Sequence, residues 1–244
     1  MGRLITGGNG MLGTALKREF PNAEFLNGKG DLDLTDLDKV EEWFKGKHYS
    51  LIIHCAAFTN LTYCEDHLQE ASMLHWHVVN VLNKYCDKLI YISTNPTTSQ
   101  KVYYLTKRSG EFDTLKSPNN LVISTNIYGN GGLAKWCYDT LSDGGIINGY
   151  ANSMFNAIHV EQLAKCINGC LLEVTGTVRI GGNYILSKYD FAKQLAIITG
   201  LDSDLINEFY LNTDESNVID IETLDYKFSL FDGMEILKKE LQNE

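Results

Sequence analysis

The sequence predicts an α/β fold built on a doubly wound parallel sheet. Apolar runs and helical periodicities alternate strictly over roughly the first 130 residues, which is the order of strands and helices in such folds. The stretch "SLIIHCAAF" at 50–58 is mostly apolar, as in a strand that is buried on both faces of a parallel sheet. A glycine-rich turn over 6–13 joins the first strand to the first helix.

Each element follows from its own pattern. A short buried strand, "RLITG" at 3–7, precedes a helix whose apolar side chains from Met11 to Leu16 share one face and which ends before Pro21. Thr35 is the expected N-cap of the next helix, "TDLDKVEEWF". The other expected elements are strands at 23–28, 50–58, 88–94 and 120–129, a helix over 65–87, and a helix that carries Tyr103 and Lys107.

The turn "ITGGNGMLGTAL" predicts a dinucleotide site. Gly7, Gly10 and Gly13 have the spacing that permits a tight turn, a close approach to a pyrophosphate and close packing of helix on strand. The N-terminus of the following helix directs unpaired N–H groups at the phosphates. Because this turn lies in the first strand-turn-helix unit, the expected fold is the NAD(P)-binding Rossmann fold.

The pattern is less regular after about residue 130. Helices are expected at 133–142, 160–172, 187–199 and 230–241, with a strand at "TVRIGG" (177–182). We therefore expect a dinucleotide-binding Rossmann core over 1–130. Residues 131–244 would form mostly a small substrate-binding lobe, with 157–182 returning to the core.

Composition and charge exclude several classes of protein. Of the residues, 44% are hydrophobic and 21% are charged, and the formal charge is −10. This balance is that of a globular protein and argues against nucleic-acid binding, which requires a basic face. No apolar run reaches the roughly 18–20 residues of a membrane span, and the start of the chain has no signal-peptide pattern.

The cysteines and histidines predict neither a disulfide framework nor a metal site. Six cysteines are scattered without a C-x-x-C pair, which indicates reduced thiols and a cytoplasmic location. His75 and His77 resemble a ligand pair, but positions two apart on a helix point to different sides. No metal is therefore expected.

The residues after the second strand bear on the choice of cofactor. A carboxylate there would bind the ribose 2′-hydroxyl of NAD and repel the 2′-phosphate of NADP. The strand ends at Asn27, which is followed by Gly28 and Lys29, and the first carboxylate is that of Asp31. NADP(H) is therefore favoured over NAD(H), with Lys29 near the 2′-phosphate.

Several stretches together resemble the extended short-chain dehydrogenase/reductases, and among these the dTDP-4-dehydrorhamnose reductases. Besides the glycine turn, they are "DLDLTDLDKV" (31–40), "HCAAFTNLTYCE" (54–65), "YISTN" (91–95), "YYLTKRSGE" (103–111), "NIYGNGG" (126–132), "FNAIHVEQLA" (155–164) and "RIGGNYILSKYDFAKQLA" (179–196). The resemblance implies an NAD(P)H-dependent reductase of a nucleotide-linked 4-keto-6-deoxy sugar. It also implies that the helices at 65–87 and 103–115 can form a homodimer.

The same resemblance implies roles for individual residues. The catalytic trio would be Thr94, Tyr103 and Lys107, and the substrate would meet Thr59 and Asn126. The residues expected at the cofactor, besides Tyr103 and Lys107, are Gly7, Gly10, Met11, Leu12, Gly13, Asn27, Lys29, Asp33, Leu34, Ala56 and Ala57.

The residue types account for the expected chemistry. Reduction of a ketone needs a hydride at carbon and a proton at oxygen, and a tyrosine can donate that proton although its ordinary pKa is about 10. Tyr103 and Lys107 are four apart and share a helix face, so the ammonium is expected to lower the pKa of the phenol. The Thr94 hydroxyl, at a strand end, can hydrogen-bond the same carbonyl oxygen.

Some positions depart from the resembled pattern. Only eight residues separate Thr94 from Tyr103, Thr62 stands where the relatives usually have an aspartate, and Ile123 replaces the usual arginine. The stretch "NVIDIETL" at 217–224 lacks the expected Arg-Pro. The cofactor half therefore matches the pattern, whereas the positions expected to contact the substrate are altered.

Two alternatives stay open. A nucleotide-sugar epimerase or dehydratase would retain its NAD, although dehydratases place carboxylates directly after the catalytic Ser/Thr and "TNPTTSQ" (94–100) has none. A non-catalytic dinucleotide-binding subunit, like the regulatory subunit of methionine adenosyltransferase, would explain the altered substrate positions. It would not need Thr94, Tyr103 and Lys107 together.

Overall fold

A computed structural model describes residues 2–95, 99–213 and 216–242. The chain divides into two compact units, Met1–Ser124 with Ala164–Val178, and Thr125–Leu163 with Arg179–Glu244. The sequence-based boundary lay near residue 130 with a returning segment at 157–182. In the structure the first unit ends at Ser124 and the returning segment is Ala164–Val178.

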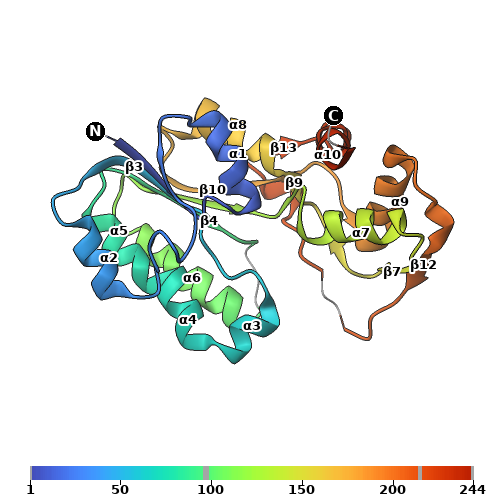
Figure 1. The fold of residues 1–244 in the computed structure, drawn as a ribbon, viewed down its shortest axis with the longest axis horizontal. Coiled ribbons are helices and arrows are strands. Elements are labelled where there is room, and N and C mark those ends of the chain that lie inside the picture. Colours follow the sequence, from blue (N-terminus) through green and yellow to red (C-terminus); the bar gives the residue numbers. More distant parts are fainter. Residues whose placement is uncertain (1, 96–98, 214–215, 243–244) are drawn as a thin grey trace. The chain divides into compact units, whose positions relative to one another are not determined.

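The elements of the first part of the chain alternate between strand and helix (Figure 1). They are β1 (Gly2–Thr6), α1 (Met11–Glu19), β2 (Glu24–Leu26), α2 (Leu37–Phe44), β3 (Tyr49–His54), α3 (Leu61–Asp66), α4 (Leu68–Ser72), the π-helix η1 (Met73–His77), α5 (Val78–Lys84), β4 (Leu89–Ser93), α6 (Val102–Thr114) and β5 (Leu121–Thr125).

The later elements are shorter on average. They are β6 (Ile127–Tyr128), α7 (Gly132–Ser142), β7 (Ile147–Tyr150), β8 (Met154–Phe155), β9 (Ile158–His159), α8 (Val160–Cys166), the π-helix η2 (Ile167–Leu171), β10 (Gly176–Gly182), β11 (Leu186–Ser187), α9 (Lys188–Thr199), η3 (Ser203–Leu205), β12 (Ile206–Phe209), η4 (Ile221–Thr223), β13 (Tyr226–Phe228) and α10 (Leu230–Gln242).

The main sheet has seven strands in the order β13-β10-β5-β4-β3-β1-β2. The pairs β1–β2, β1–β3, β3–β4, β4–β5 and β10–β13 are all parallel. After β1 the chain first adds β2 on one side and then β3 on the other, so the strand order reverses at β1. The predicted doubly wound α/β fold is confirmed, and such reversals are where these folds bind ligands, outside the carboxyl ends of the strands.

In the first unit, helices cover both faces of the sheet. Figure 1 shows α2, α5 and α6 on one face and α1 with the returning segment on the other. On the second face, the Asn168 amide donates to the Glu19 carboxylate at 3.2 Å. The core of this unit includes the fully buried side chains of Leu4, Phe44, Ile52, Leu82 and Tyr91.

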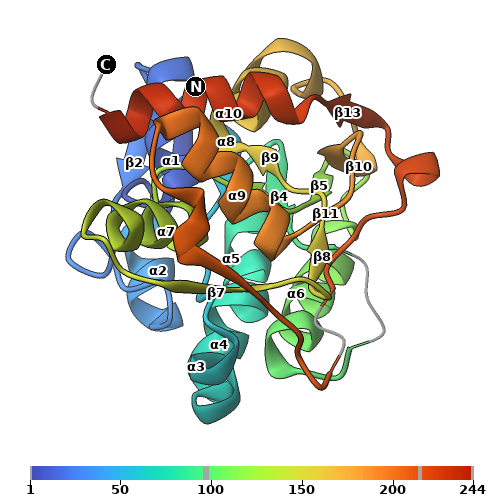
Figure 2. The same ribbon diagram turned by 90° about the vertical axis from the view of Figure 1, so that its right-hand side faces the viewer.

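The second unit has a core of its own. Figure 2 shows α7, α9 and α10 near one another, and their buried side chains include Leu141, Phe191 and Leu237. Ser187 begins α9 with a capping box, in which its hydroxyl accepts from the Asp190 N–H at 2.9 Å. This pattern of Ser followed by an acid three residues later satisfies N–H groups that the helix would leave unpaired.

Two local expectations are wrong in detail. The N-cap of α2 is Asp36, whose carboxylate accepts from the Lys39 N–H at 3.2 Å, because the Thr35 hydroxyl donates to Asp33 instead. The single helix expected over 65–87 is divided into α3, α4, η1 and α5. The π-turn of η1 inserts an extra residue into the helical ladder, which an apolar periodicity does not reveal.

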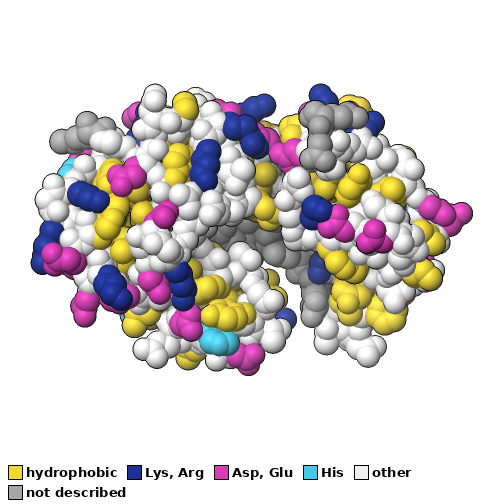
Figure 3. All heavy atoms as spheres, in the orientation of Figure 1, with side chains coloured by type: hydrophobic (Ala, Val, Ile, Leu, Met, Phe, Trp, Pro, Cys, Tyr) yellow, Lys and Arg dark blue, Asp and Glu magenta, His cyan; other side chains and the backbone are white. Residues whose placement is uncertain are grey.

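The surface carries both signs of charge. On the face shown in Figure 3, Lys and Arg side chains are interspersed with Asp and Glu and do not gather in one basic area. Across 2–95, 99–213 and 216–242, no helix combines the length and the apolar character that crossing a bilayer requires.

Candidate active site

The glycine turn after β1 depends on the absence of side chains. Gly7 has φ +71, and a Cβ added to it would lie 2.8 Å from the Ala56 N atom. A Cβ on Gly13 would lie 2.1 Å from the Gly7 carbonyl oxygen. These contacts are too close for any L-residue, so the tight turn and the approach of α1 to β1 both require glycine, as a pyrophosphate-binding turn does.

Helix α1 begins at Met11, and its N-cap Gly10 provides no side chain to cap the first turn. Met11 is half-buried, whereas Leu12 is 4% exposed and packs in the interior. The first-turn N–H groups and the positive end of the helix dipole are therefore the parts of this segment that can hold an anion.

The end of β2 presents an acceptor beside this turn. The Asn27 Oδ1 atom is buried and has no hydrogen-bond partner among the described residues, and it lies 2.6 Å from the position of a Cβ on Gly8. The Asn27 backbone N–H and Nδ2 donate to one Asp31 carboxylate oxygen at 2.8 and 3.0 Å. The absence of a side chain at Gly8 is what lets this unpaired acceptor lie against the glycine turn.

Lys29 lies between two carboxylates. Its Nζ is 3.7 Å from an Asp33 oxygen and 3.4 Å from a Glu70 oxygen, and its side chain is 56% exposed. Partial burial lowers the pKa of Lys29, but Asp33 and Glu70 outweigh this effect and raise it. Asp33 also accepts from the Thr35 N–H and hydroxyl at 3.0 and 2.7 Å, and the next residue, Leu34, is in the core.

The end of β3 is tied to the glycine turn through a buried histidine. The Thr6 hydroxyl is 2.8 Å from His54 Nδ1 and accepts from the Ala56 N–H at 3.3 Å. His54 Nε2 lies 3.0 Å from the Leu74 carbonyl oxygen and donates to it. Ala56 and Ala57 are half-buried directly after β3.

Thr94 and Tyr103 come together across the connection between β4 and α6. Thr94 directly follows β4 and is 6% exposed, Tyr103 is the second residue of α6, and their side chains are hydrogen-bonded. Residues 96–98 of the connection lie outside the described residues. Burial raises the pKa of Tyr103 to about 12, against a lowering by the Thr94 bond. The phenol therefore keeps its proton at neutral pH.

Lys107 points into the sheet from the next turn of α6. Its Nζ donates to the Ile92 carbonyl oxygen at 2.6 Å and lies 4.1 Å from the centroid of the Tyr91 ring. Burial lowers the pKa of Lys107 to about 7, with Glu111 opposing the shift. The expected lowering of the Tyr103 pKa by this ammonium is wrong, because burial of the phenol dominates.

Sequence reasoning missed Glu65 and Asn217, which help to organise the site, and considered His75 without giving it a part in the site. The Glu65 carboxylate accepts from the Val102 N–H at 2.8 Å and satisfies the N-terminus of α6. His75 is buried beside Tyr103, and Asn217 pairs with Asn126. Glu65 and His75 lie in helical stretches in which about half of the residues are apolar. A polar residue in such a stretch was the only sign in the sequence that either one contributes to the site. Nothing in the sequence around Asn217 identifies its partner.

The two residues expected at the substrate lie in different units. Thr59 is exposed in the first unit, directly before Asn60, whose side chain accepts from the Tyr63 N–H and caps α3. Asn126 is in the second unit. Its Nδ2 donates to the Asn217 carbonyl oxygen at 2.7 Å, and its Oδ1 accepts from Asn217 Nδ2 at 3.0 Å.

Within the described part of the chain, no group of three or more His, Cys, Asp or Glu side chains is placed to hold a metal ion. The two members of the "HWH" motif differ in environment. His75 uses both ring nitrogens in hydrogen bonds, whereas the half-buried His77 stacks on Trp76 with ring centroids 4.2 Å apart.

The parallel sheet, the reversal of strand order at β1 and the glycine turn at that point define a protein of the Rossmann type. Residues 1–97 match the family model described as the RmlD substrate binding domain. This match, together with the solved structures named below, confirms the predicted resemblance to the dTDP-4-dehydrorhamnose reductases.

Individual relatives agree with this match. A curated protein, the spore coat polysaccharide biosynthesis protein SpsK of Bacillus subtilis, is 21% identical over 84% of this chain and 81% of its own. The crystal structure of a dTDP-4-dehydrorhamnose reductase from Clostridium acetobutylicum is 22% identical and superposes with a TM-score of 0.86 over 100% of both chains. One from Bacillus anthracis, in complex with NADP, is 20% identical, with a TM-score of 0.85 over 98% of this chain and 99% of its own.

Proposed function

We propose that the protein is an NAD(P)H-dependent reductase of a nucleotide-linked 4-keto-6-deoxy sugar. The observation that carries the proposal is the hydrogen bond between Thr94 and Tyr103, on the unit that also holds the glycine turn. The names of the similar structures, dTDP-4-dehydrorhamnose reductases, support the substrate class. A module that only binds a dinucleotide would have no use for a buried threonine hydroxyl beside a half-buried tyrosine, one helical turn from a buried lysine.

Tyr103 donates the proton in this proposal. A nicotinamide cofactor, when bound, would supply the hydride for the carbonyl carbon, and the Tyr103 phenol would give its proton to the carbonyl oxygen, so that the ketone would become an alcohol. A pKa of about 12 keeps the proton on Tyr103 until the developing alkoxide takes it. Thr94 stabilises the resulting phenolate through the hydrogen bond that opposes the rise in pKa.

Lys107 assists the same reaction from a buried position. A lysine with a pKa of about 7 is divided between its charged and neutral forms near neutral pH. We assign it the role of binding the cofactor ribose and, in its protonated form, of providing a positive charge near the phenolate. Its contacts with Ile92 and Tyr91 hold the amine in place for this role.

The cofactor is held by residues of the first unit. We assign the pyrophosphate to Gly7, Gly10, Gly13 and the N–H groups of Met11 and Leu12. Asp33 and Leu34 border the adenine, and Ala56 and Ala57 the ribose and nicotinamide. The residues that would hold the adenosine ribose favour NADP(H) over NAD(H). The Asp31 carboxylate is engaged by Asn27, and the Lys29 ammonium, although paired with Asp33 and Glu70, is exposed and can still attract a 2′-phosphate.

The substrate is assigned to Thr59 and to the second unit, which we propose is mostly a substrate-binding lobe. Asn126 is held by Asn217, so a sugar would meet this asparagine pair rather than Asn126 alone. Asn217 lies in the stretch that lacks the expected Arg-Pro, which supports a sugar other than dTDP-rhamnose as the product.

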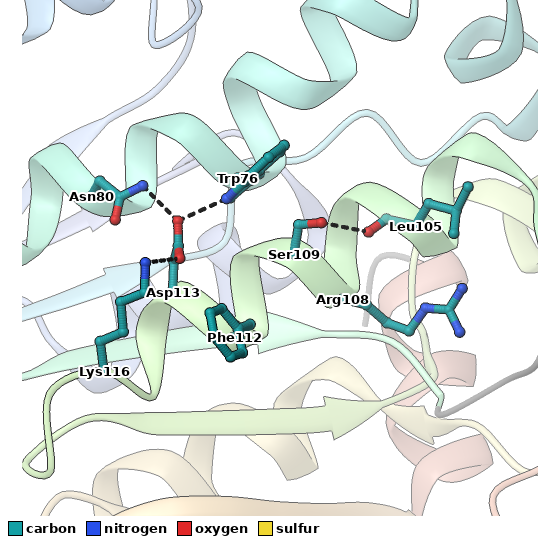
Figure 4. Close-up of a pocket in the computed structure, with 8 residues that line it drawn as sticks. All are labelled: Trp76, Asn80, Leu105, Arg108, Ser109, Phe112, Asp113 and Lys116. Carbon is teal, nitrogen blue, oxygen red and sulfur yellow. Dashed lines mark hydrogen bonds and ion pairs between the residues drawn. The ribbon is translucent and has the colours of Figure 1, made fainter.

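A homodimer through α6 is a further part of the proposal. A shallow groove is lined by Trp76, Asn80, Leu105, Arg108, Ser109, Phe112, Asp113 and Lys116 (Figure 4). Phe112 is 70% exposed and Leu105 38%, whereas Asp113 is buried and bonded to Trp76, Asn80 and Lys116. The exposed apolar side chains lie beside a hydrogen-bonded polar cluster around Asp113, and we propose that a second copy of the chain packs against them. Phe112→Asp should therefore raise the fraction of monomer measured by sedimentation.

The location proposed is the cytoplasm. All six cysteines are free thiols in the structure, and reduced thiols persist in a reducing compartment.

The test is consumption of NADPH and NADH by the wild type, Tyr103→Phe and Tyr104→Phe with a panel of dTDP-, UDP- and GDP-4-keto-6-deoxy sugars. The wild type and Tyr104→Phe should turn over one sugar, whereas Tyr103→Phe should lose about 10²–10⁴-fold in kcat. Tight NADPH binding by the wild type without turnover of any sugar would favour a non-catalytic module. Isomerisation of a sugar without net consumption of the nicotinamide would favour an epimerase.

A further inference from the structure

His75, in the π-helix η1, is fully buried, and both of its ring nitrogens have partners. The Phe58 backbone N–H donates to Nε2 at 2.9 Å. Since Nε2 is thus an acceptor, the proton of the neutral ring is on Nδ1, which donates to the Thr106 hydroxyl at 2.8 Å. The contacts therefore define one tautomer and leave no ring nitrogen for a substrate.

These bonds join the loop after β3 to the first turns of α6. The Thr106 hydroxyl oxygen lies 2.9 Å from the Val102 carbonyl oxygen and 3.0 Å from that of Tyr103, so its proton is directed at the start of the helix. The His75 ring also meets the Tyr103 ring edge to face, with centroids 5.6 Å apart and an interplanar angle of 88°. His75 thus reaches the first turn of α6 through Thr106 and contacts the ring of the proposed proton donor directly.

The backbone of His75 is held as firmly as its ring. The Tyr91 hydroxyl donates to the His75 carbonyl oxygen at 2.7 Å. A Cβ on Gly110 would lie 2.1 Å from that same oxygen, so glycine is what lets α6 approach η1 here. A residue that is held from β4, α6 and the loop after β3 has little freedom to move, so it can fix the position of a neighbour.

The groups around the ring keep it neutral. Burial, with smaller contributions from Lys107 on α6 and His54 at the end of β3, lowers the pKa of His75 to about 2. Tyr103 and Tyr91, the phenols that pack nearby, carry no charge at neutral pH because burial raises the pKa of each. A histidine in this environment does not exchange protons during a reaction.

We propose that His75 is a positioning residue for Tyr103, acting as a neutral Nδ1–H imidazole that fixes the start of α6 and the phenol against the loop after β3. This inference rests on the proposed function for its kinetic consequence. The tautomer of His75 and its two hydrogen bonds do not depend on the proposed function and can be tested without it.

The first test uses no substrate. Long-range ¹H–¹⁵N correlation spectra of the full chain should show His75 as the Nδ1–H tautomer without titration between pH 5 and 8, while His77 serves as the reference ring in the same spectrum. An Nε2–H tautomer, or titration of His75 in that range, would overturn the proposal. In His75→Phe, hydrogen exchange of the Phe58 amide should accelerate at least tenfold, because its acceptor is gone.

The kinetic test compares His75→Phe with His75→Asn. Asparagine can place an N–H near the position of Nδ1 and so keep the bond to Thr106, whereas phenylalanine removes both bonds. We expect kcat to fall at least tenfold in His75→Phe with less than a threefold change in KM, and to recover in part in His75→Asn. Thr106→Val should reproduce the loss, and His77→Phe should leave kcat unchanged.

The outcomes separate the two proposals. A folded His75→Phe variant with wild-type kcat overturns the positioning role even if Tyr103→Phe is inactive. A wild type that reduces no sugar overturns the proposed function, and the tautomer and Phe58 exchange measurements then decide the inference alone. A loss of thermal stability in His75→Phe as large as that of Thr106→Val, with a matching loss of NADPH affinity, would show a merely structural role.

Discussion

The Thr94 and Tyr103 side chains are hydrogen-bonded to each other although the connection between β4 and α6 has only eight residues between them. The bond is possible because the end of a strand and the start of the following helix are neighbours at the carboxyl edge of a parallel sheet. It brings a second hydroxyl to the proposed proton donor in an otherwise buried setting.

Replacing Thr94 by valine should slow the reaction without removing the donor. Thr94 opposes the effect of burial on Tyr103, so its loss should raise the pKa of the phenol further. We expect kcat to fall roughly 10–100-fold, as for loss of one stabilising hydrogen bond at a reacting oxygen. The pH dependence of kcat with the sugar identified in the panel checks this, and Thr94→Ser, which keeps the hydroxyl, should retain most of the activity.

The glycine turn should not tolerate a side chain at Gly13. The Cβ of Gly13→Ala would lie 2.1 Å from the Gly7 carbonyl oxygen, so β1 and α1 must separate. We expect NADPH binding, followed by nicotinamide fluorescence, to weaken at least tenfold, together with a lower Tm. Gly30→Ala is the matched control, because nothing lies within 4 Å of a Cβ there. Equal binding by both variants would contradict the assignment of the pyrophosphate.

Lys29 should matter more for NADPH than for NADH. Its ammonium is exposed and already paired with Asp33 and Glu70, so the net attraction to a 2′-phosphate is modest. We expect Lys29→Met to raise the Kd of NADPH about three- to tenfold and that of NADH less than twofold, measured by titration calorimetry at low salt. Lys45→Met, which removes an exposed partner of Glu42 away from the turn, is the control. Equal effects on both cofactors would reject the preference for NADP(H).

The protein should lose stability in acid because of two buried histidines. Burial, assisted by the charge of Lys107, lowers the pKa of His54 to about 3 and that of His75 to about 2. The unfolded chain binds these protons near pH 6.5 and the folded chain does not, so the free energy of unfolding falls as the pH decreases below about 6.5. Urea titrations from pH 7 to 4 should show this fall, and His75→Asn should make it shallower. A stability independent of pH in that range would contradict neutral burial.

Lys107 should lower the free energy of unfolding of the protein. Burial lowers its pKa to about 7, so the unfolded chain binds a proton between pH 7 and 10.5 that the folded chain does not. The stability of the wild type therefore rises with pH over that window and stays at its lower level below pH 7. Lys107→Met should be inactive yet more stable by a few kcal/mol at pH 6, with a gain that shrinks towards pH 10 in urea titrations. A destabilised Lys107→Met at pH 6 would contradict this account.

Much of the fold and the local motifs could be predicted from the sequence, because they depend on neighbours along the chain. The spacing of Gly7, Gly10 and Gly13 follows from the sterics of one turn, and the shared face of Tyr103 and Lys107 follows from helical geometry. The alternation of strands and helices requires a parallel sheet whatever the details of its packing.

The tertiary structure decided the environment of each group. The pairing of Lys29 with Glu70, the bond of His75 to Thr106 and the pairing of Asn126 with Asn217 join residues that are 41, 31 and 91 positions apart. Burial reversed the expected shift in the pKa of Tyr103, because the solvation of a phenol depends on everything packed around it. Periodicity along a chain carries no information on such contacts, so the chemistry of the site follows from the packing.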